Sequence, residues 1–161
     1  MSVESEPLVP PLIRQGELIE RISALEPQRV EGDWSRLDSA YRILSMYGES
    51  CINVTFSDGT SGYALSPRES SKLVRELREV MYRPGTGTWF SALWTLTKDA
   101  SGEVSVDVSF NYDQEPDWND PIRPFNYVLD LEDFPRDDEH IPEWLRERLV
   151  EAERNASQTG N

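Results

Sequence analysis

The residues most often used for nucleophilic catalysis are scarce in this sequence. His140 is the only histidine and Cys51 is the only cysteine. A nucleophilic serine, cysteine or threonine usually needs a histidine base beside it. His140 lies in an acidic stretch, whereas Cys51 lies in a strand-like run where a thiol packs as a small apolar group. The sequence therefore predicts a protein that is not an enzyme, unless the fold brings these two side chains together.

Metal-binding patterns are equally sparse. The chain contains no CxxC, HxxxH or HExxH spacing, which removes the common zinc motifs. Asp113, Glu115, Asp117 and Asp120 could offer oxygen ligands to calcium. A calcium loop of the EF-hand type also needs a central glycine, and here a proline and a tryptophan stand in the middle of the run. We therefore predict no metal and no other cofactor.

Paired carboxylates are the remaining route to catalysis. Two acids across a bond can act as the general acid and base of a hydrolase, and Asp113 and Glu115 are the first candidates. Nothing in the sequence indicates that one of them is desolvated, as a raised pKa would require. The segment Gly85-Thr86-Gly87 follows a helical pattern instead of leading into one, so it reads as a turn and not as a phosphate loop. A carboxylate-dependent hydrolase stays an alternative.

Acids and aromatic residues alternate in the last third of the chain. The strand-like run that ends at Phe110 leads directly into Asp113–Asp120, which contains Trp118. Aromatic anchors with surrounding carboxylates suit the recognition of a basic protein surface. We predict a partner-binding surface formed by Asp113, Glu115, Asp117, Trp118, Asp120, Tyr127 and Asp130. The alternative, for the aromatic side chains, is that they fold inward and hold the C-terminal segment on the sheet.

The net charge supports a basic partner. The chain has 161 residues and a formal charge of −14. Thirteen acids and two bases lie between Asp99 and His140, so that this segment carries −11 of the total. Such a field repels nucleic acid and anionic membranes and attracts a basic protein. Acidity can also serve solubility alone, and composition does not separate the two interpretations.

The elements that must present this surface follow from residue periodicity. Helical spacing and capping residues predict helices at 12–25, 67–82 and 125–134 and a last one from 141. In the second, Ser66 is expected to cap the helix and Glu69 to complete a capping box. Alternation and turn residues predict strands at 40–47, 51–57, 62–65, 88–97 and 103–112. Val104, Val106, Val108 and Phe110 are expected to face inward. We predict an α+β fold with one antiparallel sheet of about five strands and helices packed on one face.

The predicted organisation is one domain with short solvated ends. Residues 1–11 read as a disordered lead, 12–154 as the domain and 155–161 as a frayed tail. The first residues lack the basic start and apolar core of a signal peptide, and no run of about 18 apolar residues is present. With one cysteine there is no disulfide framework, so we expect a cytoplasmic protein.

Several segments together resemble the immunity proteins of bacterial polymorphic toxin systems. They are Phe110-Asn111-Tyr112-Asp113 with Glu115-Pro116, Tyr127-x-x-Asp130-Leu131-Glu132-x-Phe134-Pro135-Arg136-Asp137, and Ile141-Pro142-x-Trp144-Leu145. Trp34, Asp58-Gly59 and the run Trp89–Trp94 fit the same pattern, which is most similar to the YezG-like (DUF600) antitoxins. The likeness spans roughly 34–145 and departs from the family in a longer proline-rich stretch between Glu115 and Tyr127.

The resemblance implies a small α+β protein that binds and neutralises a cognate toxin domain in the cytoplasm. Toxins of such systems are often nucleases or NAD-glycohydrolases, whose clefts are basic because they take anionic substrates. An acidic inhibitor would suit such a cleft. The alternative from another class is an adaptor or chaperone-like protein that recognises basic segments of several partners.

Overall fold

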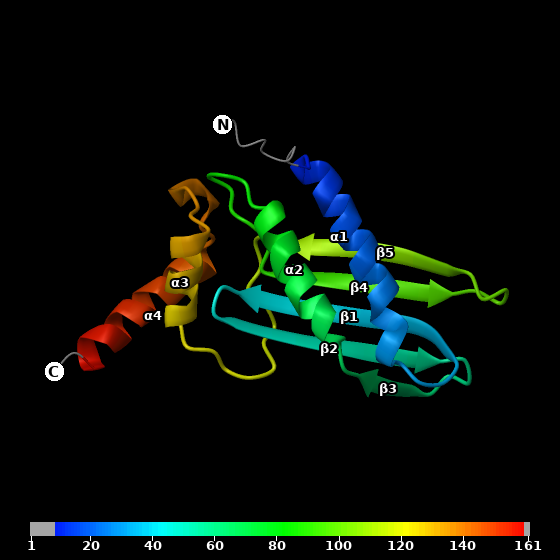
Figure 1. Ribbon diagram of the computed structural model, residues 1–161. Coiled ribbons are helices and arrows are strands. Elements are labelled where there is room, and N and C mark those ends of the chain that lie inside the picture. The colour runs from blue at the N-terminus through cyan, green and yellow to red at the C-terminus, as the bar shows by residue number, and fades with distance from the viewer. Residues whose placement is uncertain (1–8, 160–161) are drawn as a thin grey trace, which may run out of the picture.

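A computed structural model describes residues 9–159 of the chain. Its elements are α1 (Pro11–Leu25), η1 (Glu26–Arg29), β1 (Trp34–Leu44), β2 (Tyr47–Phe56), β3 (Ser61–Ala64), α2 (Arg68–Val80), β4 (Ser91–Lys98), β5 (Val104–Asn111), α3 (Phe125–Asp133), η2 (Asp138–His140) and α4 (Glu143–Thr159). All neighbouring strands are antiparallel, in the order β3-β2-β1-β4-β5 (Figure 1). The predicted α+β class with a five-stranded antiparallel sheet is confirmed.

Strand β1 is the centre of the sheet and begins earlier than the sequence predicts. Leu37 and Tyr41 are fully buried. Arg36 and Asp38, the neighbours of Leu37 in sequence, form an ion pair with 2.9 Å between Nε of Arg36 and Oδ2 of Asp38. These charged residues point to the outer face of the sheet, which α1 and α2 leave open. The strand predicted at 40–47 therefore starts too late, because residues 35–39 were assigned to no element.

Helices α1 and α2 cover one face of the sheet (Figure 1). Leu18 and Ile22 of α1 and Leu77 of α2 are buried in a core that includes Trp94 of β4. The helical spacing of these apolar positions therefore predicted the right face of each helix. The two helices are also joined at the surface, because the Arg14 guanidinium donates to Glu76 at 2.7 Å and 2.9 Å.

The predicted cap of α2 is wrong. Pro67 occupies the capping position, and no side chain accepts a hydrogen bond from the first turn. Ser66 lies within the fold with no hydrogen-bond partner for its hydroxyl, and Glu69 pairs with Arg21 of α1 instead of closing a capping box. Packing of the apolar face, and not the cap, stabilises this helix.

Helices α3 and α4 lie beyond one end of the sheet (Figure 1). Their core is a second cluster in which Leu44 and Phe90 from the strand ends meet Tyr127 and Leu145 from the two helices. The Tyr127 and Trp144 rings pack edge to face at 5.4 Å between centroids. The expectation that helices pack on one face thus holds for α1 and α2, while α3 and α4 close the end of the sheet.

Two predicted boundaries and one predicted orientation need correction. Residues 155–159 belong to α4, so the predicted tail is helical up to Thr159, and 160–161 lie outside the described residues. The predicted lead ends where α1 begins at Pro11, and 1–8 also lie outside the described part. Val104 and Val106 are 41% and 45% exposed, because the helices do not reach this end of β5. Within residues 9–159, no helix is both long and apolar enough to span a membrane.

Candidate functional site

The acidic loop, defined here as Asp113–Asp120, crosses the end of the sheet from β5 to β2. At its start, the Asn111 side chain donates to the Gln114 carbonyl at 2.8 Å and accepts from the Gln114 N–H at 2.9 Å. At its end, the N–H groups of Asn119 and Asp120 donate to the Glu49 carboxylate at 2.9 Å and 3.2 Å. Both ends of the loop are therefore fixed to strands.

Glu49 is an acceptor that the sequence did not single out. Partial burial acts to raise its pKa, but the two loop N–H groups and the Tyr47 hydroxyl outweigh this and hold the pKa below its usual value. Arg42 lies 3.5 Å away and adds to the same effect. The charged form of Glu49 is thus the form that holds the loop.

Helix α4 fixes the first half of the acidic loop. The Trp144 indole N–H donates to the Asp113 carbonyl at 2.7 Å, and the Arg148 guanidinium donates to Glu115 at 2.8 Å and 3.1 Å. These hydrogen bonds to Glu115 raise the pKa of Arg148 above its ordinary value. Glu115 is therefore engaged within the chain, with 34% of its side chain exposed.

Trp118 points inward from the loop. Its indole N–H donates to the Tyr127 hydroxyl at 3.0 Å, and its ring lies 5.4 Å from the Tyr47 ring between centroids. The side chain is half-buried. Trp118 also lines a cleft of about 360 Å³ together with Ile122, Arg148 and Glu151. The alternative in which Trp118 folds inward therefore accounts for its contacts, while part of the ring still reaches this cleft.

Tyr127 and Asp130 do not belong to a partner-binding surface, and this part of the prediction is wrong. Tyr127 is 1% exposed, and burial raises the pKa of its hydroxyl to about 12. Asp130 is 2% exposed and forms two hydrogen bonds with Arg78 at 2.5 Å and 2.7 Å. A buried carboxylate needs such a partner, and Arg78 lies too far along the chain for local sequence to reveal it.

Three carboxylates of the predicted set remain free to meet a partner. Asp113 has 79% of its side chain exposed and its Oδ1 lies 4.0 Å from Arg136. Asp117 and Asp120 are exposed. Asp117 also borders a shallow hollow of about 280 Å³ on the outer face of the sheet, beside Arg42 and Leu93. The acidic loop and the open face of the sheet thus form one continuous surface.

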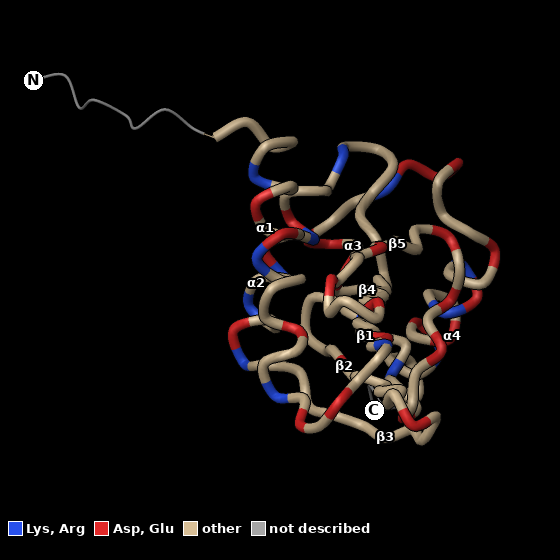
Figure 2. Tube along the Cα trace, turned by 90° about the vertical axis from the view of Figure 1, so that its right-hand side faces the viewer, with Lys and Arg blue, Asp and Glu red and all other residues tan. Residues whose placement is uncertain are grey.

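Arg136 is the second residue that the sequence analysis undervalued. Its side chain is 1% exposed and donates to the carbonyls of Thr88 and Tyr112, both at 2.8 Å. Its guanidinium lies over the Phe90 ring at 4.5 Å from the centroid. One of the two bases in the acidic segment is therefore internal and makes its hydrogen bonds within the chain. In Figure 2, by contrast, acids and bases intermix along α1 and α2 on the other side of the molecule.

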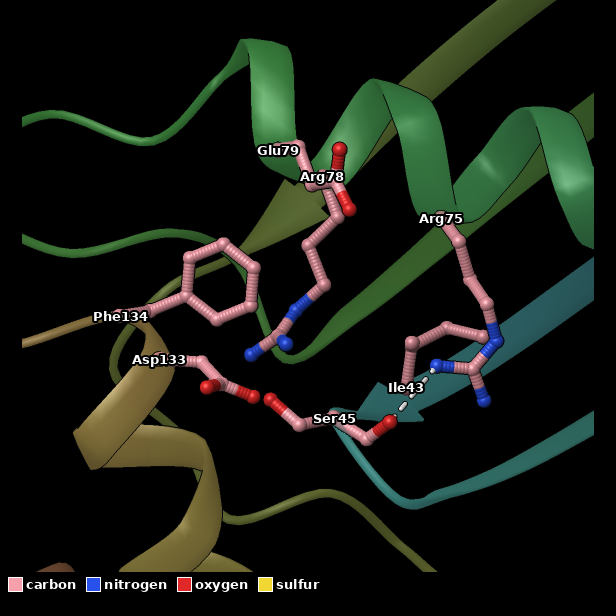
Figure 3. A pocket seen from close by; sticks show the side chains of 7 residues that line it. All are labelled: Ile43, Ser45, Arg75, Arg78, Glu79, Asp133 and Phe134. Atoms are coloured by element: carbon pink, nitrogen blue, oxygen red, sulfur yellow. Dashed lines mark hydrogen bonds between the residues drawn. The ribbon is translucent and has the colours of Figure 1, made fainter.

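A second cleft, of about 440 Å³, lies between α2, the end of β1 and α3 (Figure 3). The Arg75 guanidinium donates from Nη1 to the carbonyls of Leu44 and Ser45 at 3.0 Å and 3.3 Å, and burial lowers its pKa. Arg78 turns toward Phe134 and is paired with Asp130. Both arginines hold elements together, so this cleft has a structural explanation.

The residues of the catalytic alternatives have ordinary surroundings. His140 is exposed in η2 with its Nε2 3.6 Å from Glu139, and Cys51 is a half-buried free thiol in β2. Among the described residues, no three side chains of His, Cys, Asp or Glu gather in a way that could hold a metal ion. Asp113 and Glu115 face Arg136 and Arg148 and not each other. The arrangement is suited to binding a charged surface.

Comparison with known proteins adds no relative. No family model matches this chain, and no curated protein matches it. The interpretation of the site therefore depends on its own geometry and charge.

Proposed function

We propose that this protein is an immunity protein that neutralises a cognate toxin domain in the bacterial cytoplasm by direct stoichiometric binding. The observation that carries the proposal is the acidic loop, whose backbone is fixed at both ends and whose Glu115 side chain is paired with Arg148, while the carboxylates of Asp113, Asp117 and Asp120 reach solvent. A fixed array of charge loses little conformational freedom on binding. It therefore suits tight recognition of one partner.

The partner is a basic protein surface of the kind that lines an active site for anionic substrates. The net charge of −14 accelerates the encounter, and the fixed carboxylates orient it. Glu115 contributes through its ion pair with Arg148, which holds the loop in the binding conformation. The resemblance to YezG-like antitoxins agrees with this function and shares Asp113 and Glu115 with the acidic loop.

The test is binding to the toxin domain encoded beside this protein in its genome. We expect the two chains to co-purify when co-expressed, and the toxin's growth inhibition to disappear. Asp113→Lys combined with Asp117→Lys should slow association by about tenfold or more at low salt, and the difference should shrink as salt screens the charges. Their exposure predicts little change in unfolding free energy.

A charge-matched control separates local from global effects. Glu20→Lys with Glu31→Lys makes the same change in net charge at exposed positions on α1 and in the connection that follows η1. This variant should keep most of the association rate. Equal slowing by the two double variants would show that only net charge matters, and an unchanged rate in the loop variant would refute the acidic loop as the binding site.

A further inference from the structure

Strand β5 is the long free edge of the sheet. It forms the end of the strand order and pairs with β4 along all of its eight residues. In the described part of the chain, no strand or bridge pairs with its other side. The opposite edge, β3, has only four residues. An unpaired edge of this length is a ready template for another extended segment.

The backbone direction of β5 follows from its hairpin. The Asp99 N–H donates to the Glu103 carbonyl at 3.0 Å, so these two residues form a hydrogen-bonded pair. Hydrogen-bonded and non-bonded pairs alternate along an antiparallel ladder. The N–H and C=O groups of Val104, Val106 and Val108 therefore point away from β4 and toward the free edge.

The side chains of the same residues are also open to contact. Val104 and Val106 are 41% and 45% exposed, although their register places them on the helix-covered face of the sheet. Native edge strands are normally protected by a charge or proline that points into the edge. Here the acids Glu103 and Asp107 are exposed beside the valines. The edge thus combines free backbone groups, apolar side chains and negative charge.

From this combination we infer that β5 takes up an extended segment of the basic partner by strand addition. Lysine or arginine side chains on the added strand would lie beside Asp107 and Glu103, and apolar ones would cover Val104 and Val106. A second copy of this chain is a poor occupant, since each copy carries −14 and would bring its own acids to the edge. The inference rests on the proposed function only for the identity of the partner as a toxin domain.

The probe is a cyclised β-hairpin peptide whose outer strand alternates lysine and valine. Amide hydrogen exchange, followed by NMR on the full-length protein, reads each position of β5 separately. On saturation with the peptide, the amides of Val104, Val106 and Val108 should exchange about tenfold more slowly or better. Those of Ser105 and Asp107, which already face β4, should change little. A hairpin with glutamate in place of lysine should bind at least about tenfold more weakly.

Two variants test the edge directly. Val106→Pro removes an outward N–H, which an edge strand tolerates, and should weaken binding of the lysine hairpin by about tenfold or more while the circular dichroism spectrum is kept. Asp107→Lys should also weaken it, whereas Glu20→Lys should stay within about twofold. Undiminished binding by Val106→Pro, protection only in the acidic loop, or self-association through β5 would each overturn the inference.

The outcomes also separate this inference from the proposed function. Protection of β5 by the hairpin, without binding to the neighbouring toxin domain, would keep the docking edge and remove the toxin as its partner. Binding of the toxin with unchanged exchange at Val104, Val106 and Val108 would keep the immunity function and refute strand addition.

Discussion

The ion pair between Arg78 and Asp130 offers the sharpest test of how α3 is held against the rest of the fold. Both side chains are 2% exposed, and the two nitrogens of Arg78 reach the two oxygens of Asp130 at 2.5 Å and 2.7 Å. Asp130 also accepts the Ser45 N–H at 2.9 Å. This one carboxylate therefore joins α3 to α2 and to the end of β1. The perturbation is Asp130→Ala.

The size of the effect follows from what remains after the substitution. Arg78 would keep its charge in a buried position, where its remaining hydrogen bond is to the Trp89 carbonyl at 2.7 Å. Breaking a buried pair by removing one partner costs about 3–5 kcal/mol. The Ser45 N–H loses its acceptor, which adds about 1 kcal/mol. Total stabilities of small domains are about 5–15 kcal/mol, so Asp130→Ala should bring the protein close to its unfolding threshold.

Urea denaturation measures this cost, and a double variant tests its cause. Arg78→Met with Asp130→Leu removes both charges and fills the space with apolar groups, and such replacements are often neutral or stabilising. The double variant should therefore be more stable than Asp130→Ala alone. A cost below about 1 kcal/mol for Asp130→Ala, or a double variant as unstable as the single one, would show that the pair does not hold α3 against α2 and β1.

Three further predictions address the core, the loop and the pH dependence. Leu77→Ala should cost about 2–5 kcal/mol in denaturant unfolding, because Leu77 is fully buried between α2 and the sheet, and a cost under about 1 kcal/mol would mean that this face is misassigned. Trp118→Ala should lower the melting temperature by about 2–4 °C for each kcal/mol of stability lost, and Trp118→Phe should lower it less. If Trp118→Ala instead weakened partner binding and left the melting temperature unchanged, Trp118 would be an exposed anchor for the partner. Burial raises the pKa of Glu26, so its stabilising contribution is complete below the unfolded pKa of about 4.3 and is lost as pH rises through the folded value. Wild type should therefore lose stability relative to Glu26→Gln between about pH 4 and 7, and a constant difference across this range would contradict the assignment.

Local periodicity predicted the elements that bury one regular face. The alternation around Ile52 and Val54 and the stripe around Val74 and Leu77 each placed a strand or helix correctly. Periodicity failed where the two faces of an element were not simply polar and apolar. The start of β1 was missed for this reason, since Ser39 is a polar residue on the buried face and the register shifts between Trp34 and Arg36, which breaks the apolar alternation.

The proposed binding surface could be predicted only in part because its supports are distant in sequence. The acidic loop was visible in the sequence as an acidic run, and three of its predicted carboxylates are exposed in the structure. Glu49, Trp144 and Arg148, which hold that loop, lie on β2 and α4 and carry no local signal of the contact. Asp130 looked like another surface acid because its partner, Arg78, stands 52 positions away.

The rigidity of the acidic loop distinguishes between the two binding functions. A protein that accepts many basic segments gains from a surface that can repack, usually a flexible or methionine-rich one. The acidic loop is instead held by hydrogen bonds to three separate elements, among them the Glu49 carboxylate and the Arg148 guanidinium. Holding charges in one arrangement favours a partner whose own charges are fixed in the complementary arrangement. A folded toxin domain has that property and a set of unrelated basic segments does not, so the geometry favours a single cognate partner over a general adaptor.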